Sequence, residues 1–428
     1  MQMQNVKGTA DFFGPEQSLR LKVRKVLEEV FELYDFTPME TPVLNELELL
    51  ASKYTGGEEI LKEMYRLTDQ GERELGLRYD LTLPFAKVMA LNPGLSVPFK
   101  RYEIGKVFRD GPVKRGRMRE FLQCDADVAG IDGPEAEAEL MQLAAEVFRR
   151  LEVPVTIRWN NRRLLGEVLE SVGVKAEDTL TVMLTLDKKD KLGTGAVMRE
   201  LAEKGLEPAV LRPLTALLEM ERPTFDAVAS ACGILESPGA GEVLALQRWI
   251  GALGMEETCR FDPFLSRGLS FYTGTVYEIF DASGAYTSSL GAGGRYDDMI
   301  GRLVGREDLA RSAAGLSFGM ESMMELLRAR ESAQVQAIVD IISVGGMRPE
   351  ALAAAKAFRE NGIRTRLSPG GRKLAKALAA SSALGIPYIV LVGEEEAALG
   401  QVRLKDMGAR TESVLDLDEA VHVLSKLV

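Results

Sequence analysis

The sequence predicts an α+β protein in which an antiparallel sheet with flanking helices is followed by a small α/β domain. Two segments, 99–108 and 119–129, alternate along the chain as paired strands do, and Pro112 and Gly116 lie between them. Toward the C-terminus, short apolar strands instead alternate with helical segments, which is typical of an α/β domain. The length of 428 residues allows roughly two to four domains.

The remaining elements of the first domain follow from local periodicity. Apolar residues recur at helical spacing over 16–34 and again over 134–151, and the Pro-punctuated stretch "FTPMETPVL" between those helices is expected to be extended. The chain is mostly helical by period over 161–250. We interpret this region as an insertion of about 170–252 into the sheet domain.

Strands are expected to resume at 273–280 and to continue, after the turn "DASGAY", into "GAGGRYD" at 291–297. A helix from about Ser317 closes the region. The predicted domains are therefore 1–330, which contains the sheet and the helical insertion, and 336–428, which is the compact α/β domain.

Two glycine-rich segments, "GAGGRYD" and "SPGGRKL", fit neither the GxGxxG nor the GxxxxGK[ST] pattern of phosphate-binding loops. Taken alone, both are more typical of turns that need a positive φ. The alternative for "GAGG" is that its missing side chains let a planar or phosphorylated ligand approach the backbone.

Composition excludes several classes of function. A formal net charge of −11 argues against a protein that coats nucleic acid unselectively, although local basic patches remain compatible with it. The one histidine, His422, excludes a histidine metal cluster and makes a histidine base unexpected. The cysteines Cys124, Cys232 and Cys259 are far apart, so we expect no zinc site or disulfide framework.

The same features favour a cytoplasmic protein. The N-terminus "MQMQNVKGTADFFG" lacks the apolar core of a signal peptide. No apolar run approaches the ~18 residues that would span a bilayer. We therefore expect no membrane association.

Basic residues crowd the tip of the predicted hairpin, at Arg109, Lys114, Arg115, Arg117 and Arg119. An isolated run of this kind would more simply be a solvated loop. Most of these residues are arginines, however, and a guanidinium binds phosphate through a planar, two-pronged fork. We therefore weigh a phosphate clamp against the solvated loop.

The second half of the hairpin supports the clamp, because period two places a set of chemically suited side chains on one strand face: Arg119, Phe121, Gln123, Asp125 and Asp127. An arginine and a phenylalanine near the loop suit a nucleotide, and the deeper amide and carboxylates suit a second ligand. The segments "LRYDLT" (77–82) and "RGLSFYTG" (267–274) contribute further candidates, although each alone is as consistent with a surface turn or an ordinary strand entry.

Together these segments resemble a class II aminoacyl-tRNA synthetase and, within that class, the histidyl-tRNA synthetase family. "FTPMETPVL" resembles motif 1, "FRDGPVKRGRMREFLQCDAD" motif 2, and "GAGGRYDDMI" with "GLSFGMESM" the approach to motif 3 and motif 3 itself. "RGLSFYTGTVYEIF" resembles the signature peculiar to the histidine enzymes, and "VKGTADF" the family's N-terminus. The similarity covers nearly the whole chain, since 338–428 resembles the family's anticodon-binding domain.

The resemblance implies a class II synthetase-type, six-stranded antiparallel sheet with flanking helices, a helical insertion, and a C-terminal anticodon-binding-type domain. It implies a homodimer built through motif 1. It also implies a histidine–tRNA ligase, which uses ATP and Mg²⁺ to activate histidine and then transfers it to tRNA(His). No residue is predicted to bind a metal.

Residue roles carried over by motif position are as follows. ATP would be bound by Arg109 and Arg267 at the α-phosphate, Arg117 at the outer phosphates and Phe121 against adenine. Histidine would be bound by Asp80, Thr82, Gln123, Asp127, Tyr272, Thr273 and Tyr296. Arg109 and Arg267 are the predicted catalytic residues, since a carboxylate attacking a phosphate needs charge neutralised at both partners.

Three positions depart from the family's pattern. Motif 3 normally ends in Glu-Arg, but here Glu321 is followed by Ser322. A charge-assisted contact stabilises by ~1.5–3 kcal/mol, so its loss is expected to weaken ATP use roughly ten- to a hundredfold. Ser270 and Phe271 stand where the family usually has Asp and Tyr. Arg311 is a nearby candidate to replace the missing guanidinium.

Three functions are consistent with the sequence. The first is an active histidine–tRNA ligase, including a divergent second copy. The second is a catalytically impaired paralogue that binds histidine as the regulatory subunit of ATP phosphoribosyltransferase. The third is a paralogue that activates another amino acid or loads a carrier protein.

Overall fold

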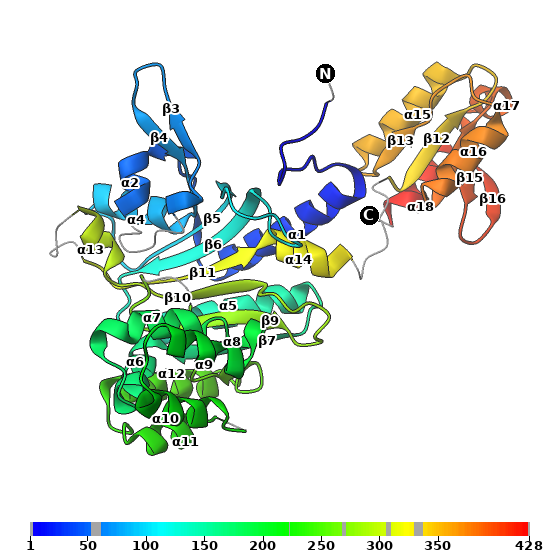
Figure 1. Cartoon of the computed structure of the whole chain (residues 1–428). Coiled ribbons are helices and arrows are strands. Elements are labelled where there is room, and N and C mark those ends of the chain that lie inside the picture. The colour runs from blue at the N-terminus through cyan, green and yellow to red at the C-terminus, as the bar shows by residue number, and fades with distance from the viewer. Residues whose placement is uncertain are drawn as a thin grey trace. The chain divides into compact units, whose positions relative to one another are not determined.

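The structure is a computed structural model that describes residues 3–52, 61–221, 223–267, 271–304, 310–328 and 337–426. The chain divides into two compact units. The first takes in the described residues of 1–11 and 20–330, and the second those of 12–19 and 331–428. Figure 1 shows the ribbon of the whole chain.

The first unit is built on a sheet whose strands follow the order β1 (Thr37–Pro38), β5 (Phe99–Phe108), β6 (Glu120–Ala129), β11 (Ala313–Gly319), β10 (Gly291–Arg295), β9 (Thr275–Asp281), β7 (Val155–Asn161) and β8 (Cys259–Phe261). From β5 to β7 every neighbouring pair is antiparallel. This confirms the predicted antiparallel sheet. The edge strands β1 and β8 pair in parallel, so the complete sheet is mixed.

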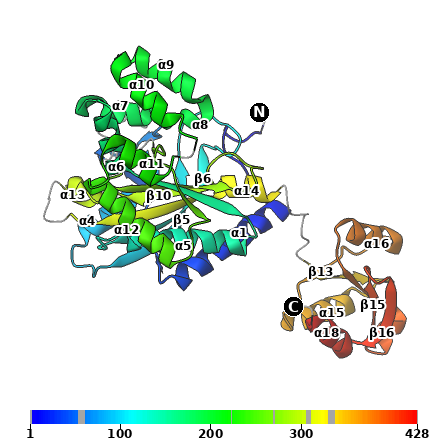
Figure 2. The ribbon, with the colours of Figure 1, turned by 90° about the horizontal axis from the view of Figure 1, so that it is seen from below.

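One face of this sheet packs on α1 (Gly14–Leu33) and α5 (Glu135–Arg150), which the periodicity of the sequence predicted. The Phe31 ring stacks on Tyr102 with centroids 5.0 Å apart, and Phe148 approaches Phe318 at 5.8 Å. These apolar contacts occupy the face opposite Gln123 and Asp125, because side chains alternate along β6. The polar face of the central strands is therefore left for a site. Figure 2 shows α1 and α5 lying together on the same side of β5.

Two predictions about the end of this unit are wrong. Ser317 lies inside β11, and helix α14 (Met320–Arg328) begins after it. "GAGGR" is strand β10 and not a turn. Both segments are central strands that pair with neighbours far away in the sequence, and this tertiary pairing overrides their weak local preference.

Among the described residues, seven helices lie between β7 and β9, where the sequence predicted an insertion of about 170–252. They are shown in green in Figure 1: α6 (Arg162–Ser171), α7 (Ala176–Leu186), α8 (Lys189–Leu192), α9 (Thr194–Glu203), α10 (Pro208–Leu218), α11 (Phe225–Cys232) and α12 (Pro238–Ala252). A three-stranded sheet lies on the other side of the hairpin and has the order β2 (Leu44–Glu46), β4 (Glu74–Leu77) and β3 (Arg66–Thr68). It is accompanied by α2 (Leu47–Ser52) and α4 (Thr82–Leu91), and α13 (Met299–Val304) packs on α4. These elements surround the polar face of the main sheet.

The second unit is a mixed sheet of the order β13 (Thr365–Leu367), β12 (Val339–Ser343), β14 (Tyr388–Val392), β15 (Gln401–Asp406) and β16 (Thr411–Asp416). Its helices are α15 (Arg348–Glu360), α16 (Leu374–Ala383), α17 (Glu394–Ala398) and α18 (Leu417–Ser425). A core of its own is built from residues such as Val339, Phe358 and Leu424. The predicted α/β domain is therefore present, although the sequence did not indicate β16 or α17.

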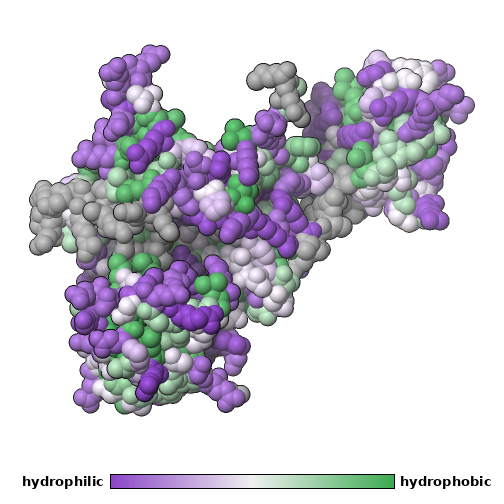
Figure 3. Space-filling view, viewed as in Figure 1, coloured by the Kyte–Doolittle hydropathy of each residue, from purple (hydrophilic) through white to green (hydrophobic). Residues whose placement is uncertain are grey.

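The surface in Figure 3 is mostly hydrophilic, and apolar side chains appear on it in small patches. No helix of the described residues is long and apolar enough to cross a membrane.

Candidate functional site

A cavity of about 400 Å³ opens on the polar face of the central strands. Its lining residues are Tyr79, Asp80, Thr82, Arg109, Phe121, Gln123, Arg267, Phe271, Tyr272, Ser289, Leu290, Gly291, Ala292, Ser317 and Gly319. The cavity therefore joins the hairpin, the N-terminal end of α4, the stretch before β9, and strands β10 and β11.

Small residues of β10 and β11 form the floor of this cavity. In the register of the sheet, Ser317 lies opposite Ala292, and Gly319 lies opposite Gln123. Because side chains of opposed residues share a face, a larger residue at Ala292 or Gly319 would fill the space beside Gln123. The alternative interpretation of "GAGG", as a place of close approach for a ligand, fits this geometry.

Two guanidinium groups reach the cavity. That of Arg109 lies 4.2 Å from the centroid of the Tyr79 ring and 5.1 Å from that of Phe121, and no carboxylate of the described residues pairs with it. Arg267 forms an ion pair with Glu278. Burial opposes its charge, but Glu278, Tyr272 and Asp187 together more than offset this effect and raise the pKa of Arg267. Both guanidinium groups suit an anionic ligand.

Aromatic rings form one wall. The rings of Phe271 and Tyr272 have centroids 4.5 Å apart, and Phe271 meets Tyr296 edge to face at 6.1 Å. Burial raises the pKa of the Tyr272 phenol. Its hydroxyl therefore stays protonated and is available to hydrogen bonds.

A buried charge cluster lies behind this wall. Asp127 accepts a hydrogen bond from the Tyr296 hydroxyl and lies 2.6 Å from Nη2 of Arg101. A Cβ on Gly315 would come within 2.0 Å of Asp127 Oδ1, so a glycine is needed opposite this carboxylate. Burial raises the pKa of Asp125 to about 7, and the charge of Asp127 adds to the shift while Arg101 opposes it.

The structure brings most of the predicted site residues together in this cavity: Asp80, Thr82, Arg109, Phe121, Gln123, Arg267 and Tyr272. Asp127 and Tyr296 do not line it but bond to each other behind it. Thr273 shares hydrogen bonds with Asp297, outside the lining. Arg117 is also outside, half-exposed, with Nη2 3.3 Å from the Glu63 carboxylate.

Several lining residues were not predicted. Ser317 and Gly319 were assigned to a helix or left without a role, and Tyr79 was passed over although it lies in the quoted segment "LRYDLT". Tyr79 contacts Arg109 because β4 lies beside the hairpin in the folded protein. The spacing of residues along the sequence does not indicate that contact.

The departures from the motif pattern can also be placed. The Ser322 hydroxyl is 3.2 Å from that of Tyr286, and Arg311 donates to its neighbour Ala310. Arg311, the candidate replacement for the missing guanidinium, lines a separate small pocket with Met89 and Ile300 and is not among the residues that line the 400 Å³ cavity. Phe271 lines the cavity, and Ser270 is outside the described residues.

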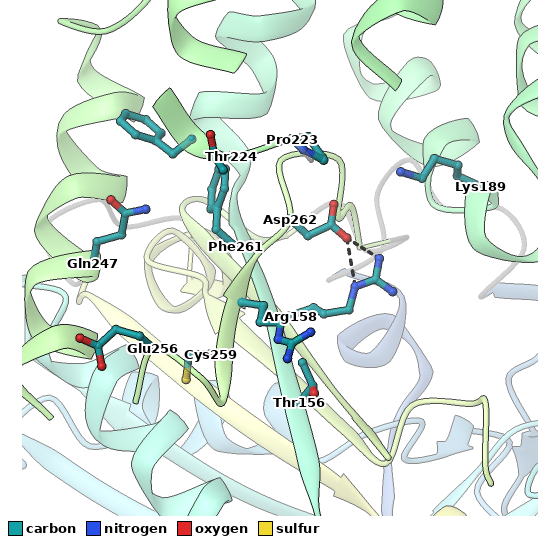
Figure 4. A pocket seen from close by; sticks show the side chains of 12 residues that line it. Thr156, Arg158, Lys189, Pro223, Thr224, Gln247, Glu256, Cys259, Phe261 and Asp262 are labelled. Carbon is teal, nitrogen blue, oxygen red and sulfur yellow. Dashed lines mark hydrogen bonds and ion pairs between the residues drawn. The ribbon is translucent and has the colours of Figure 1, made fainter. Parts of the chain in front are cut away.

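A second cavity, of about 720 Å³, lies between the edge of the main sheet and the insertion (Figure 4). Its Arg158 donates to Asp262, as the dashed lines in Figure 4 show, and to Asp190. Because these carboxylates neutralise Arg158, this cavity is less suited to an anion than the one that holds Arg109.

The hairpin, the antiparallel sheet and the arginine-lined cavity on its polar face define a class II aminoacyl-tRNA synthetase. The solved structure of histidyl-tRNA synthetase from Nostoc sp. PCC 7120 superimposes with a TM-score of 0.85 at 25% identity and covers 100% of both chains. The structure of an ATP phosphoribosyltransferase regulatory subunit/histidyl-tRNA synthetase from Bacillus halodurans C shares the fold, with a TM-score of 0.73 at 20% identity, over 92% of this chain and 97% of that one.

Sequence comparison defines the family. Residues 8–323 match the histidyl-tRNA synthetase model, and residues 336–427 match an anticodon binding domain. Histidine–tRNA ligase 2 of Shouchella clausii (strain KSM-K16) is 45% identical over 96% of this chain and 97% of its own length. Histidine–tRNA ligase 1 of Bacillus anthracis is 44% identical over 99% and 100%. This chain belongs to the histidyl-tRNA synthetase family.

Proposed function

We propose that this chain is a histidine–tRNA ligase that activates histidine with ATP and esterifies tRNA(His). The observation that carries the proposal is one cavity in which Arg109 lies between aromatic rings, without a carboxylate partner among the described residues, beside the polar side chains of Gln123 and Tyr272. Such a cavity can hold a triphosphate and a small polar substrate side by side.

The reaction needs no protein base. The histidine carboxylate attacks the α-phosphorus, an oxygen–phosphorus bond forms, and pyrophosphate leaves with the electrons of the α–β bridge. The 3′-terminal hydroxyl of the tRNA then attacks the carbonyl carbon of the adenylate and gives its proton to an oxygen of the adenylate phosphate. The bond between the carbonyl carbon and the bridging oxygen breaks, and AMP leaves. Fixed cations that neutralise the phosphate oxygens supply most of the acceleration.

For the nucleotide, we propose that Arg109 and Arg267 bind the α-phosphate, that Phe121 stacks on adenine, and that Arg117 reaches the outer phosphates. Arg117 must then exchange Glu63 for phosphate oxygens, which the exposure of its side chain favours. Mg²⁺ would enter with ATP as the counter-ion of the triphosphate, since no cluster of three acidic, cysteine or histidine ligands occurs among the described residues.

For histidine, the proposed ligands at the cavity are Asp80, Thr82, Gln123 and Tyr272, with Asp127, Tyr296 and Thr273 behind them. A polar pocket of this kind rejects apolar analogues, because they would leave buried polar groups without partners.

The test is histidine-dependent exchange of labelled pyrophosphate into ATP, followed by charging of tRNA(His). Exchange with histidine and not with other amino acids is expected. Exchange only with another amino acid would instead support the paralogue of different specificity.

A second function is favoured by one observation, the serine at position 322 in place of a motif 3 arginine. It is a histidine-binding regulatory subunit of ATP phosphoribosyltransferase. Calorimetric binding of histidine without any exchange would support this candidate and exclude the ligase.

We also propose that the chain is a homodimer. Apolar side chains near the motif 1 segment are exposed, among them Leu33 at 62%, Leu44 at 47% and Val43 at 37%. Light scattering should therefore give twice the chain mass of 46.9 kDa.

A further inference from the structure

Three side chains on the polar face of β6 and β11 form a line from the protein core to the cavity. The Gln123 amide donates from Nε2 to Oγ of Ser317 at 2.9 Å. Ser317 lies directly opposite Asp125 in the register of the two strands, which places its hydroxyl on the same face of the sheet as the Asp125 carboxylate. Asp125 is only 2% exposed, whereas Gln123 and Ser317 line the cavity.

The Gln123 amide at one end of this line and the Asp125 carboxylate at the other determine which way the Ser317 hydroxyl points its proton. The Ser317 hydroxyl has one proton and already accepts from Gln123, so that proton is free to go to Asp125. An ionised carboxylate can only accept, and therefore it fixes the hydroxyl in this orientation. Were Asp125 a donor, the hydroxyl would instead turn its proton toward Gln123 and favour the opposite orientation of the amide.

The outcome is a carbonyl oxygen without a partner at the cavity. Oε1 of Gln123 is buried and accepts no hydrogen bond within the described part of the chain. A buried acceptor in this state is costly unless a ligand supplies the donor. An ammonium or imidazole N–H of a bound amino acid is a donor of the required kind.

We propose that Asp125 is a positioning residue, which acts through Ser317 to hold the Gln123 carbonyl oxygen toward an N–H group of the amino-acid substrate. This inference rests on the proposed function and deepens it. It gives a role to Asp125 and Ser317, for which the motif comparison gave none. The amide is held in one orientation before the substrate arrives, so its ordering entropy is not lost on binding.

The surroundings of Asp125 are consistent with an ionised carboxylate under assay conditions near pH 8. Arg101 is the cation that faces it, and Asp127 and Asp80 are the acidic neighbours. Glu103, opposite Asp125 on β5, is engaged by Arg78 at 2.7 Å.

The experiment compares Ser317→Ala, Asp125→Asn and the double variant in histidine-dependent pyrophosphate exchange at pH 8. Each single change should raise the KM for histidine about tenfold, which corresponds to one lost hydrogen bond, and should leave the KM for ATP within about twofold. The double variant should be no worse than either single one, because both changes break the same line. Ser317→Thr, which keeps the hydroxyl, should recover most of the loss.

Ser312→Ala is the matched control, since it removes another hydroxyl that donates to a carboxylate, that of Asp132, just before β11 and outside the cavity. It should change neither KM. Equal effects on both KM values, additive effects in the double variant, or an unchanged KM for histidine would overturn the positioning role. If Asp125→Asn does not fold, the KM for histidine of Ser317→Ala is compared with that of Ser317→Thr. Equal values in these two variants would overturn the positioning role.

The unaltered chain is measured in the same assay, which separates this inference from the proposed function. Exchange by the unaltered chain with an unchanged histidine KM in the variants rejects only the positioning role. If the unaltered chain shows no exchange, the ligase proposal fails, and calorimetry of histidine binding to the same variants then tests the positioning role. Absence of histidine binding to the unaltered chain would reject both.

Discussion

Arg109 is packed between two aromatic rings, and no described carboxylate forms an ion pair with its guanidinium group. We expect Arg109→Ala to lower kcat/KM for exchange roughly hundredfold, because the proposed site would lose its preorganised cation for the reacting phosphate. Steady-state exchange kinetics measure the effect.

Arg115 on the same hairpin provides the matched control. Its exposed side chain pairs with Glu325 at 2.9 Å, so Arg115→Ala should leave exchange nearly unchanged. Equal losses in Arg109→Ala and Arg115→Ala would mean that the loop acts only through its summed charge.

The pKa of Asp125 gives a prediction about stability. The folded protein retains this proton up to about pH 7, whereas an unfolded chain releases it near pH ~4. The unfolded state therefore binds fewer protons between these values, and the contribution of Asp125 to the free energy of unfolding falls as the pH rises from about 4 to 7.

Asp125→Asn removes this titration. Its free energy of unfolding, measured with urea and taken relative to the unaltered chain, should increase from pH 4 to pH 7 and become constant above. A difference that does not vary with pH over that interval would contradict the raised pKa.

At the scale of elements, α1 is tied to α14 by a buried ion pair between Arg20 and Glu321. Nη1 lies 2.6 Å from Oε2 and Nη2 lies 3.0 Å from Oε1, and both side chains are almost fully buried. Glu321→Ala leaves a buried guanidinium without this partner, which costs about 3–5 kcal/mol of unfolding free energy. Urea unfolding tests this value.

The double variant Arg20→Met with Glu321→Leu should be less destabilised than Glu321→Ala, because it removes both charges. Glu29→Ala in the same helix α1 breaks two partly exposed pairs, those with Lys25 and Arg150, and should have little effect. A loss in Glu321→Ala no larger than that in Glu29→Ala would show that the buried pair does not hold the helices together.

Elements with a strong local signal were predictable. The hairpin β5–β6 alternates along its length, and α1 and α5 have a clear apolar stripe, so each was placed close to its observed bounds. A strand was expected to lead into "GAGGRYD", although "GAGG" taken alone is more typical of a turn. Strand β11 was not recognised, because "AAGLSFG" contains small residues whose conformation depends on pairing with β10 and β6. The helix predicted at Ser317 failed for this reason.

Over the whole molecule, the candidate site could be predicted only in part. Its residues come from segments spread between Tyr79 and Gly319, and motif resemblance identified those that point into the cavity from β6 and α4. Resemblance gave no information on local partners. The pairing of Arg117 with Glu63, and of Asp127 with Arg101 and Tyr296, depends on side chains that lie outside the quoted motifs or in different ones.

Division into two units gives the last prediction. All residues that line the candidate cavity belong to the first unit, and the second has a separate core. A chain that ends after residue 330 should keep histidine-dependent exchange within about tenfold, since the adenylate forms in that cavity. The same chain should charge tRNA(His) at least a hundredfold more slowly, because it lacks the segment that matches an anticodon binding domain.

Circular dichroism of the shortened chain provides the control for folding. A folded, shortened chain that charges tRNA as fast as the full chain would show that the second unit does not contribute to tRNA binding, and one that has lost exchange would show that the cavity depends on both units.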